Sequence, residues 1–139
     1  MKKLILSIAT TFAFAQLPSS FGMCNSLANI SASNPPIPLK TDYREIKEYA
    51  CNNKIVFIGI RDDVPGLLKL WDVNKDTKDF LIKHFTFKGH KAVVYIDKGV
   101  KKGDIIIQLE ENKSVEVMFN GTDYKQILQY LESFPFYSV

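Results

Sequence analysis

Two stretches of the chain are almost continuously apolar and rich in β-branched residues, Lys54–Ile60 and Lys91–Asp97. Strands that are buried on both faces have this composition, and such strands lie in the middle of sheets that helices flank. Both stretches are therefore predicted to be central strands.

Two helical regions are predicted before and between these strands. Asp42 and Glu45 have the spacing of a capping box, and the apolar residues that follow lie on one side of a helix ending at Asn52-Asn53. Residues 64–85 place apolar side chains at helical spacing with an interruption at residues 74–77, which indicates one broken helix or two short ones. Strand, helix and strand in this order form a βαβ unit, whose crossover is nearly always right-handed.

The last third of the chain predicts a hairpin and a closing helix. Asp104–Leu109 and Ser114–Phe119 are strands joined by a polar turn, and the alternation in the second strand predicts one packed face. Asn120-Gly121 turns the chain, and Asp123 caps an amphipathic helix that Pro135 stops. The apolar stripe of this helix consists of Tyr124, Ile127, Leu128, Leu131 and Phe134.

This order of elements resembles the thioredoxin-like superfamily. The likeness covers most of residues 41–134 and is best over Asp104–Phe134, which looks like the last two strands and the last helix of a thioredoxin. It implies an α/β fold, with α+β as a possibility, in which a three-layer sheet carries a C-terminal antiparallel hairpin and a closing helix.

The chain departs from the family at three places. The active cysteines of the family follow the first central strand, where a helix N-terminus lowers the thiol pKa, but residues 61–66 here contain no cysteine. The position of the family's cis-proline is occupied by Lys102-Gly103-Asp104, and the linker from Lys98 to Gly103 is too short for the usual helix. A plain three-stranded meander from Lys91 to Phe119, in an α+β sheet, is the alternative.

The N-terminus has the layout of a secretory signal peptide. Lys2 and Lys3 are followed by an apolar stretch from Leu4 to Leu17, which Pro18 ends. The triplet Ser20-Phe21-Gly22 puts small residues three and one positions before a cut after Gly22. The predicted division is therefore a signal peptide over residues 1–22, an extended arm rich in Pro, Ser and Asn over residues 23–40, and one thioredoxin-like domain over residues 41–139.

Two other cut sites fit the same small-x-small rule, after Ala15 and after Ala28. A cut after Ala28 would remove Cys24. Lipidation of Cys24 is a further alternative, although Met23 and Phe21 are not the residues that a lipidation site prefers. An uncleaved N-terminal anchor is the remaining alternative.

Length and charge limit the classes of protein. The chain has 139 residues and a net charge of +3, which includes Lys2 and Lys3, so one nearly neutral domain remains after export. A nucleic-acid-binding domain usually has a clustered basic face, and none is predicted here. The expected partner is an unknown protein, with no nucleic acid and no stable membrane span after cleavage, and the expected location is the periplasm or the secreted space.

The two cysteines leave the redox state open. Cys24 and Cys51 can form a disulfide because export usually leads to an oxidising compartment. In the other interpretation Cys51 is a small buried apolar residue and Cys24 is lost or unpaired. Neither residue belongs to a Cys-x-x-Cys motif.

Few residues suggest chemistry. Asp62-Asp63 is a carboxylate pair whose simpler interpretation is helix capping, and His84 lies on an apolar stripe. His84 and His90 have no Cys or carboxylate at the spacing of a zinc site. The sequence therefore predicts no catalytic, cofactor-binding or metal-binding residue, and no cofactor.

Two classes of function follow. The favoured one is an exported, non-catalytic domain that binds a partner as an accessory or assembly protein. The alternative is a relative of the thiol-disulfide oxidoreductases that works through a single cysteine. Cys51 precedes the first central strand, at the wrong end of the sheet for that chemistry, which favours binding over an enzyme.

Overall fold

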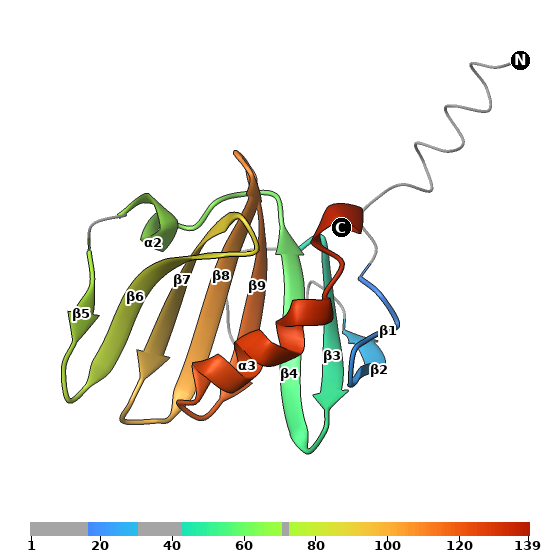
Figure 1. The fold of residues 1–139 in the computed structure, drawn as a ribbon, viewed down its shortest axis with the longest axis horizontal. Helices are drawn as coiled ribbons and strands as arrows, with labels where there is room; N and C mark the ends of the chain where they lie inside the picture. The colour runs from blue at the N-terminus through green and yellow to red at the C-terminus, as the bar shows by residue number, and fades with distance from the viewer. Residues whose placement is uncertain (1–16, 31–42, 71–72) are drawn as a thin grey trace, which may run out of the picture.

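The computed structural model describes residues 17–30, 43–70 and 73–139, which form one antiparallel sheet with little helix (Figure 1). Nine strands are present in these residues, in the order β1-β2-β3-β4-β9-β8-β7-β6-β5. They are β1 (Ser20–Phe21), β2 (Cys24–Ile30), β3 (Glu45–Cys51), β4 (Lys54–Arg61), β5 (Lys75–Asp76), β6 (Phe80–Phe87), β7 (His90–Asp97), β8 (Lys102–Glu110) and β9 (Lys113–Asn120).

The sheet consists of two runs of strands that follow each other in sequence. β1 to β4 pair in chain order, and so do β5 to β9, and every pairing is antiparallel. The two runs meet only where β4 pairs with β9, from Val56 opposite Phe119 to Arg61 opposite Ser114.

The predicted thioredoxin-like α/β fold is therefore wrong. The two apolar strands expected to be parallel neighbours, now β4 and β7, are separated in the sheet by β9 and β8, and no described strand pair is parallel. The alternative of a meander from Lys91 to Phe119 is confirmed, because β7, β8 and β9 pair in sequence.

The helix predicted after Asp42 is the strand β3. Tyr49 and Cys51 are buried on one face of the sheet and Ile46 on the other. A strand that buries apolar residues on both faces can imitate the spacing of a helix over one or two turns. Asn52-Asn53 does not end a helix but forms the two-residue turn to β4, and Asn52 takes a positive φ of 58° there.

The helical region predicted over residues 64–85 is wrong for the same reason. It contains only the short helix α2 (Gly66–Lys69) before β5 and β6. Leu81 and Phe85 of β6 face one side of the sheet, and Ile82 and His84 face the other. Trp71, which is predicted to be a core residue of this region, lies outside the described residues.

The predicted C-terminal hairpin and closing helix are confirmed, but the single packed face predicted for the second strand is wrong, because β9 is buried on both faces. The strands predicted at Asp104–Leu109 and Ser114–Phe119 are β8 and β9, and the closing helix is α3 (Tyr124–Tyr130), continued by the 3₁₀ turn η1 (Leu131–Ser133). The Asp123 carboxylate caps α3 by accepting a hydrogen bond from the Gln126 amide at 3.1 Å.

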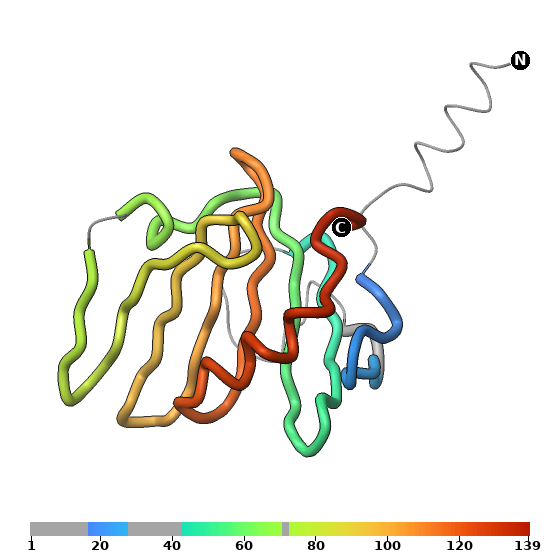
Figure 2. Tube along the Cα trace, viewed as in Figure 1, coloured from blue at the N-terminus to red at the C-terminus, as the bar shows by residue number. Residues whose placement is uncertain are grey.

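One face of the sheet, called the helix face, carries the main core. α3, η1 and the final turn η2 (Phe136–Ser138) run across it towards the N-terminal strands, as the tube in Figure 2 shows. The buried core includes Ile58 and Ile60 of β4, Val115 and Val117 of β9, Ile105 and Ile107 of β8, and Ile127 and Leu131 from the helical segment.

The opposite face, called the network face, is covered in smaller patches. Leu68 of α2 packs on Val93 and Ile106, and Tyr43 packs with Ile46 and Met118. Between these two patches the sheet presents charged side chains rather than apolar ones. The candidate site lies in this gap.

The N-terminal strands belong to the sheet. β1 and β2 come from the segments predicted as the signal peptide and the extended arm, and residues 31–40 of that arm lie outside the described residues. Cys24 and Cys51 lie directly opposite each other on β2 and β3, and they form a disulfide.

We expect Ile127→Ala to destabilise the protein by about 2–5 kcal/mol, because Ile127 is fully buried between α3 and the sheet. The thermal midpoint should fall by roughly 10 °C or more. Gln129→Ala, on the exposed side of the same helix, is the control and should change little. Equal melting of the two variants would show that α3 does not pack on the helix face.

Candidate functional site

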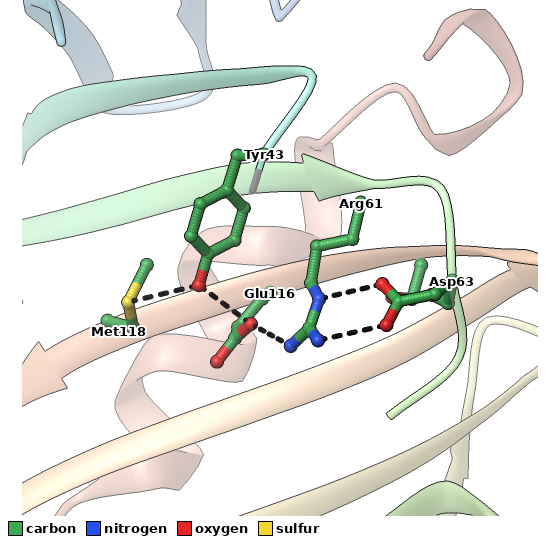
Figure 3. A network of polar contacts seen from close by, with 6 residues as sticks. Tyr43, Arg61, Asp63, Glu116 and Met118 are labelled. Carbon is green, nitrogen blue, oxygen red and sulfur yellow. Dashed lines mark hydrogen bonds and ion pairs between the residues drawn. The ribbon is translucent and has the colours of Figure 1, made fainter. Parts of the chain in front are cut away.

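A buried ion pair crosses the β4–β9 pairing on the network face (Figure 3). Arg61 Nη1 of β4 donates a hydrogen bond to Glu116 Oε1 of β9 at 2.7 Å. The side chains are only 10% and 3% exposed. Charges so far from water require direct partners, because their desolvation costs several kcal/mol per ion.

Tyr43 provides a second partner for Glu116. Its hydroxyl donates to the same Oε1 at 2.8 Å and lies 3.8 Å from Met118 Sδ. The ring lies over Gly59, where a Cβ atom would come within 2.5 Å of the ring carbon Cδ1, so glycine is required for this approach. Burial, together with the Glu116 carboxylate, raises the pKa of the Tyr43 hydroxyl, which therefore stays a donor.

The outer end of the network is a bidentate pair. Arg61 Nε and Nη2 donate to the two carboxylate oxygens of Asp63 at 3.0 and 3.1 Å. Its neighbour Asp62 pairs with Arg44 at the surface. The predicted capping role of Asp62-Asp63 is therefore wrong, because α2 follows Pro65 and has no side-chain cap.

A further carboxyl group lies beside this network. Asp104 of β8 is opposite Met118 of β9 and Tyr95 of β7, next to Glu116 on the same face. Its Oδ1 atom is buried and has no hydrogen-bond partner among the described residues. Burial, a hydrogen bond between the Asp104 and Glu116 side chains and the charge of Glu116 raise the pKa of Asp104 well above its usual range, and Arg61 only partly opposes this.

A pocket of about 240 Å³ opens next to Asp104. Its walls are mostly apolar, from Tyr95, Val100, Gly103 and Met118, and Asp97 and Lys102 complete the lining. Asp97 Oδ1 accepts the amides of Gly99 and Val100 at 2.9 and 3.2 Å, so it holds the turn that carries Val100. This turn places an exposed apolar side chain at the mouth of the pocket.

The charged groups of the site differ in whether they are paired. The strongest charges of the site, Arg61 and Glu116, are buried and engage each other, whereas Asp104 offers a buried polar atom beside an apolar pocket. Within the described residues no group of three or more His, Cys, Asp or Glu side chains could hold a metal ion.

The other predicted candidates lie elsewhere. His84 is half-buried near α2, and its ring nitrogens lie 2.8 and 2.6 Å from the carbonyl oxygens of Val73 and Leu67. His90 begins β7 and contacts the ring of Phe136. Gly22 lies in the turn between β1 and β2 with a φ of 53°. Cys24 and Cys51 are brought together but lie in the helix-face core, away from the network.

Sequence reasoning missed Arg61, Asp104 and Glu116 as a group. Each is a charged residue inside or at the end of an apolar strand, and the alternation that predicts one packed face over Ser114–Phe119 puts Glu116 on the opposite face. A charged residue in a strand that is otherwise apolar on both faces is expected to be buried, and a buried charge needs a partner. This feature of the sequence could have pointed to the group.

Comparison of the chain with protein-family models, curated proteins and solved structures found no match. In the part of the chain that the structure describes, no helix has the length and apolar character needed to cross a membrane.

We expect Asp104→Asn to make the protein more stable at pH 8 than the unmodified chain, with a difference that shrinks towards pH 4. The raised pKa means that the folded state holds the Asp104 proton more tightly than the unfolded state, where the pKa is about 3.9. The stability from this proton is complete below that value and is lost as the pH rises towards the folded pKa. The amide side chain of the Asp104→Asn variant is neutral over this whole pH range, so the variant does not lose this stability as the pH rises.

Urea unfolding of both proteins between pH 4 and pH 8 measures this difference. Glu111→Gln, at an exposed turn between β8 and β9, is the charge-matched control. A stability difference for Asp104→Asn that did not vary with pH would contradict the burial of an ionisable Asp104.

Proposed function

We propose that the protein is an exported, non-catalytic domain that binds a partner protein through the pocket beside Asp104. Export is supported by the basic and apolar N-terminus and by the Cys24–Cys51 disulfide, because disulfides persist mainly in oxidising compartments. The periplasm and the secreted space both meet this condition.

One observation carries the binding proposal: the buried Asp104 Oδ1 has no hydrogen-bond partner among the described residues and belongs to a residue that lines an open pocket. Buried polar atoms nearly always have a partner, and an unpaired one costs about 1–3 kcal/mol. A ligand that donates a hydrogen bond in this pocket would remove that cost.

The size of the pocket favours a protein partner over a cofactor. Pockets for drug-sized ligands measure about 300–1,000 Å³, and this one has about 240 Å³. It suits one inserted side chain with an apolar body and a terminal N–H or O–H donor. Such anchors provide much of the affinity of protein interfaces.

The alternative of a single-cysteine oxidoreductase has less support. Such an enzyme attacks its substrate with an accessible thiolate, whereas both cysteines of this chain are fully buried and paired with each other. We therefore expect the purified protein to show no insulin reduction above background. Turnover that a Cys51→Ser substitution abolished would restore the enzymatic alternative.

A photo-crosslinking experiment tests the binding proposal. A photoreactive amino acid at position 100, which is 62% exposed at the pocket mouth, should give a discrete adduct in cells that export the protein. Asp104→Leu should reduce this adduct by roughly tenfold, because the inserted donor loses its acceptor.

Position 137 is the matched control. Tyr137 is 95% exposed but belongs to η2 on the helix side, so the same photoreactive residue there should not give this adduct. Adducts of equal yield at both positions, or an adduct at position 100 that Asp104→Leu leaves unchanged, would overturn the pocket as the binding site.

A further inference from the structure

The six residues before Met23 are part of the folded domain, although the sequence assigns them to the signal peptide. Leu17 is 2% and Phe21 is 6% exposed, and both belong to the main core. The Phe21 ring lies edge-on to Tyr49 and Phe134, with ring centres 5.1 and 5.0 Å apart.

Backbone atoms of the same segment have specific partners on β2 and β3. The Leu17 amide donates to Glu45 Oε1 at 2.7 Å, and the Leu17 carbonyl accepts from Lys47 Nζ at 3.0 Å. The Pro18 carbonyl accepts the buried Tyr49 hydroxyl at 2.6 Å. β1 then pairs with β2, with Phe21 opposite Cys24.

A cut after Gly22 would remove all of these contacts. Tyr49 would lose the partner of its hydroxyl, and the loss of Phe21 would open a cavity between Tyr49 and Phe134. A cut after Ala28 would also remove Cys24 and with it the disulfide. Lipidation of Cys24 would use the sulfur that the disulfide occupies.

We infer that the leader is removed between Ala15 and Gln16, so that the mature chain begins one residue before Leu17. The triplet Ala13-Phe14-Ala15 fits the small-x-small rule, and a leader of 15 residues lies at the lower end of the usual range of about 15–30. The inference rests on the proposed export of the protein, but not on its pocket.

The position of this cut also preserves the first contact of the domain. A signal peptidase adds water across the Ala15–Gln16 amide, which leaves a carboxylate on Ala15 and an ammonium group on Gln16. The Leu17 nitrogen remains an amide and keeps its hydrogen bond to Glu45. The new ammonium group is on Gln16, which is adjacent in sequence to Leu17, the residue whose amide binds the Glu45 carboxylate.

The mass of the exported protein tests the inference. The full chain is expressed in a secreting host and recovered from the exported fraction, and the expected intact mass is that of residues 16–139, with or without loss of ammonia through cyclisation of Gln16. Tandem mass spectrometry of the N-terminal peptide confirms the first residue. A mature chain beginning at Met23 or Asn29 would overturn the inference while leaving export intact.

Two variants distinguish the cut after Ala15 from a cut after Gly22. Ala13→Arg disrupts the position three residues before the inferred cut and should abolish processing. Ser20→Arg disrupts the equivalent position for a cut after Gly22, at an exposed residue, and should leave the mature mass changed only by the substitution. Unprocessed Ser20→Arg would overturn the inference, and a wild-type chain that retains Met1 would overturn both the inference and the proposed export.

Discussion

The pairing of β4 with β9 holds the whole sheet together. Every other pair of neighbouring strands is also consecutive in sequence, so each of the two strand runs forms from local contacts. Among the described strand pairings, only β4 with β9 joins residues more than 50 positions apart, and without it the hydrogen-bonded sheet would divide into the β1–β4 run and the β5–β9 run. This one pairing therefore depends on side-chain contacts on both of its faces. α3 and the segment after it cover the helix face, where Ile127 and Leu131 pack with residues of β4 and β9.

On the network face, β4 and β9 are joined by the ion pair between Arg61 and Glu116 rather than by apolar contacts. A buried ion pair adds little net stability compared with apolar residues of equal volume, but an unpaired member is costly. Arg61 and Glu116 meet only in the observed register, since a shift of β4 by one residue would turn Arg61 to the helix face. Tyr43, held over Gly59, adds a third element to this arrangement. We regard the network as the device that fixes the register between the two runs, and Asp104 as the group beside it whose polar atom the network leaves unpaired.

The sequence predicted individual strands better than their arrangement. The elements of residues 104–134 are predicted correctly because apolar residues recur at every second position from Val115 to Phe119 in the sequence, α3 has one apolar stripe, and polar turn residues separate them. The sequence predicts helix over residues 43–51 and 80–85 because β3 and β6 place apolar side chains on both faces, so the period of two is lost. The sequence leaves the disulfide as one of two possibilities, and it does not group Arg61, Asp104 and Glu116 because their contacts join three strands. That grouping depends on which strands are neighbours, and local periodicity contains no such information.

The N-terminus shows how packing can resolve what a motif leaves open. Ala15, Gly22 and Ala28 satisfy the same rule for leader cleavage, and the rule cannot rank them because it describes only the residues around the cut. The fold distinguishes the three cuts by the contacts that each would remove. A cut after Gly22 or Ala28 would remove Leu17 and Phe21 from the main core and β1 from the edge of the sheet beside β2. The disulfide reinforces this, because it fixes β2 to β3 at Cys24, three residues after Phe21. Among the three candidate cuts, only the one after Ala15 would leave the sheet, the core and the disulfide intact, and we propose this cut because it preserves the contacts that define the domain.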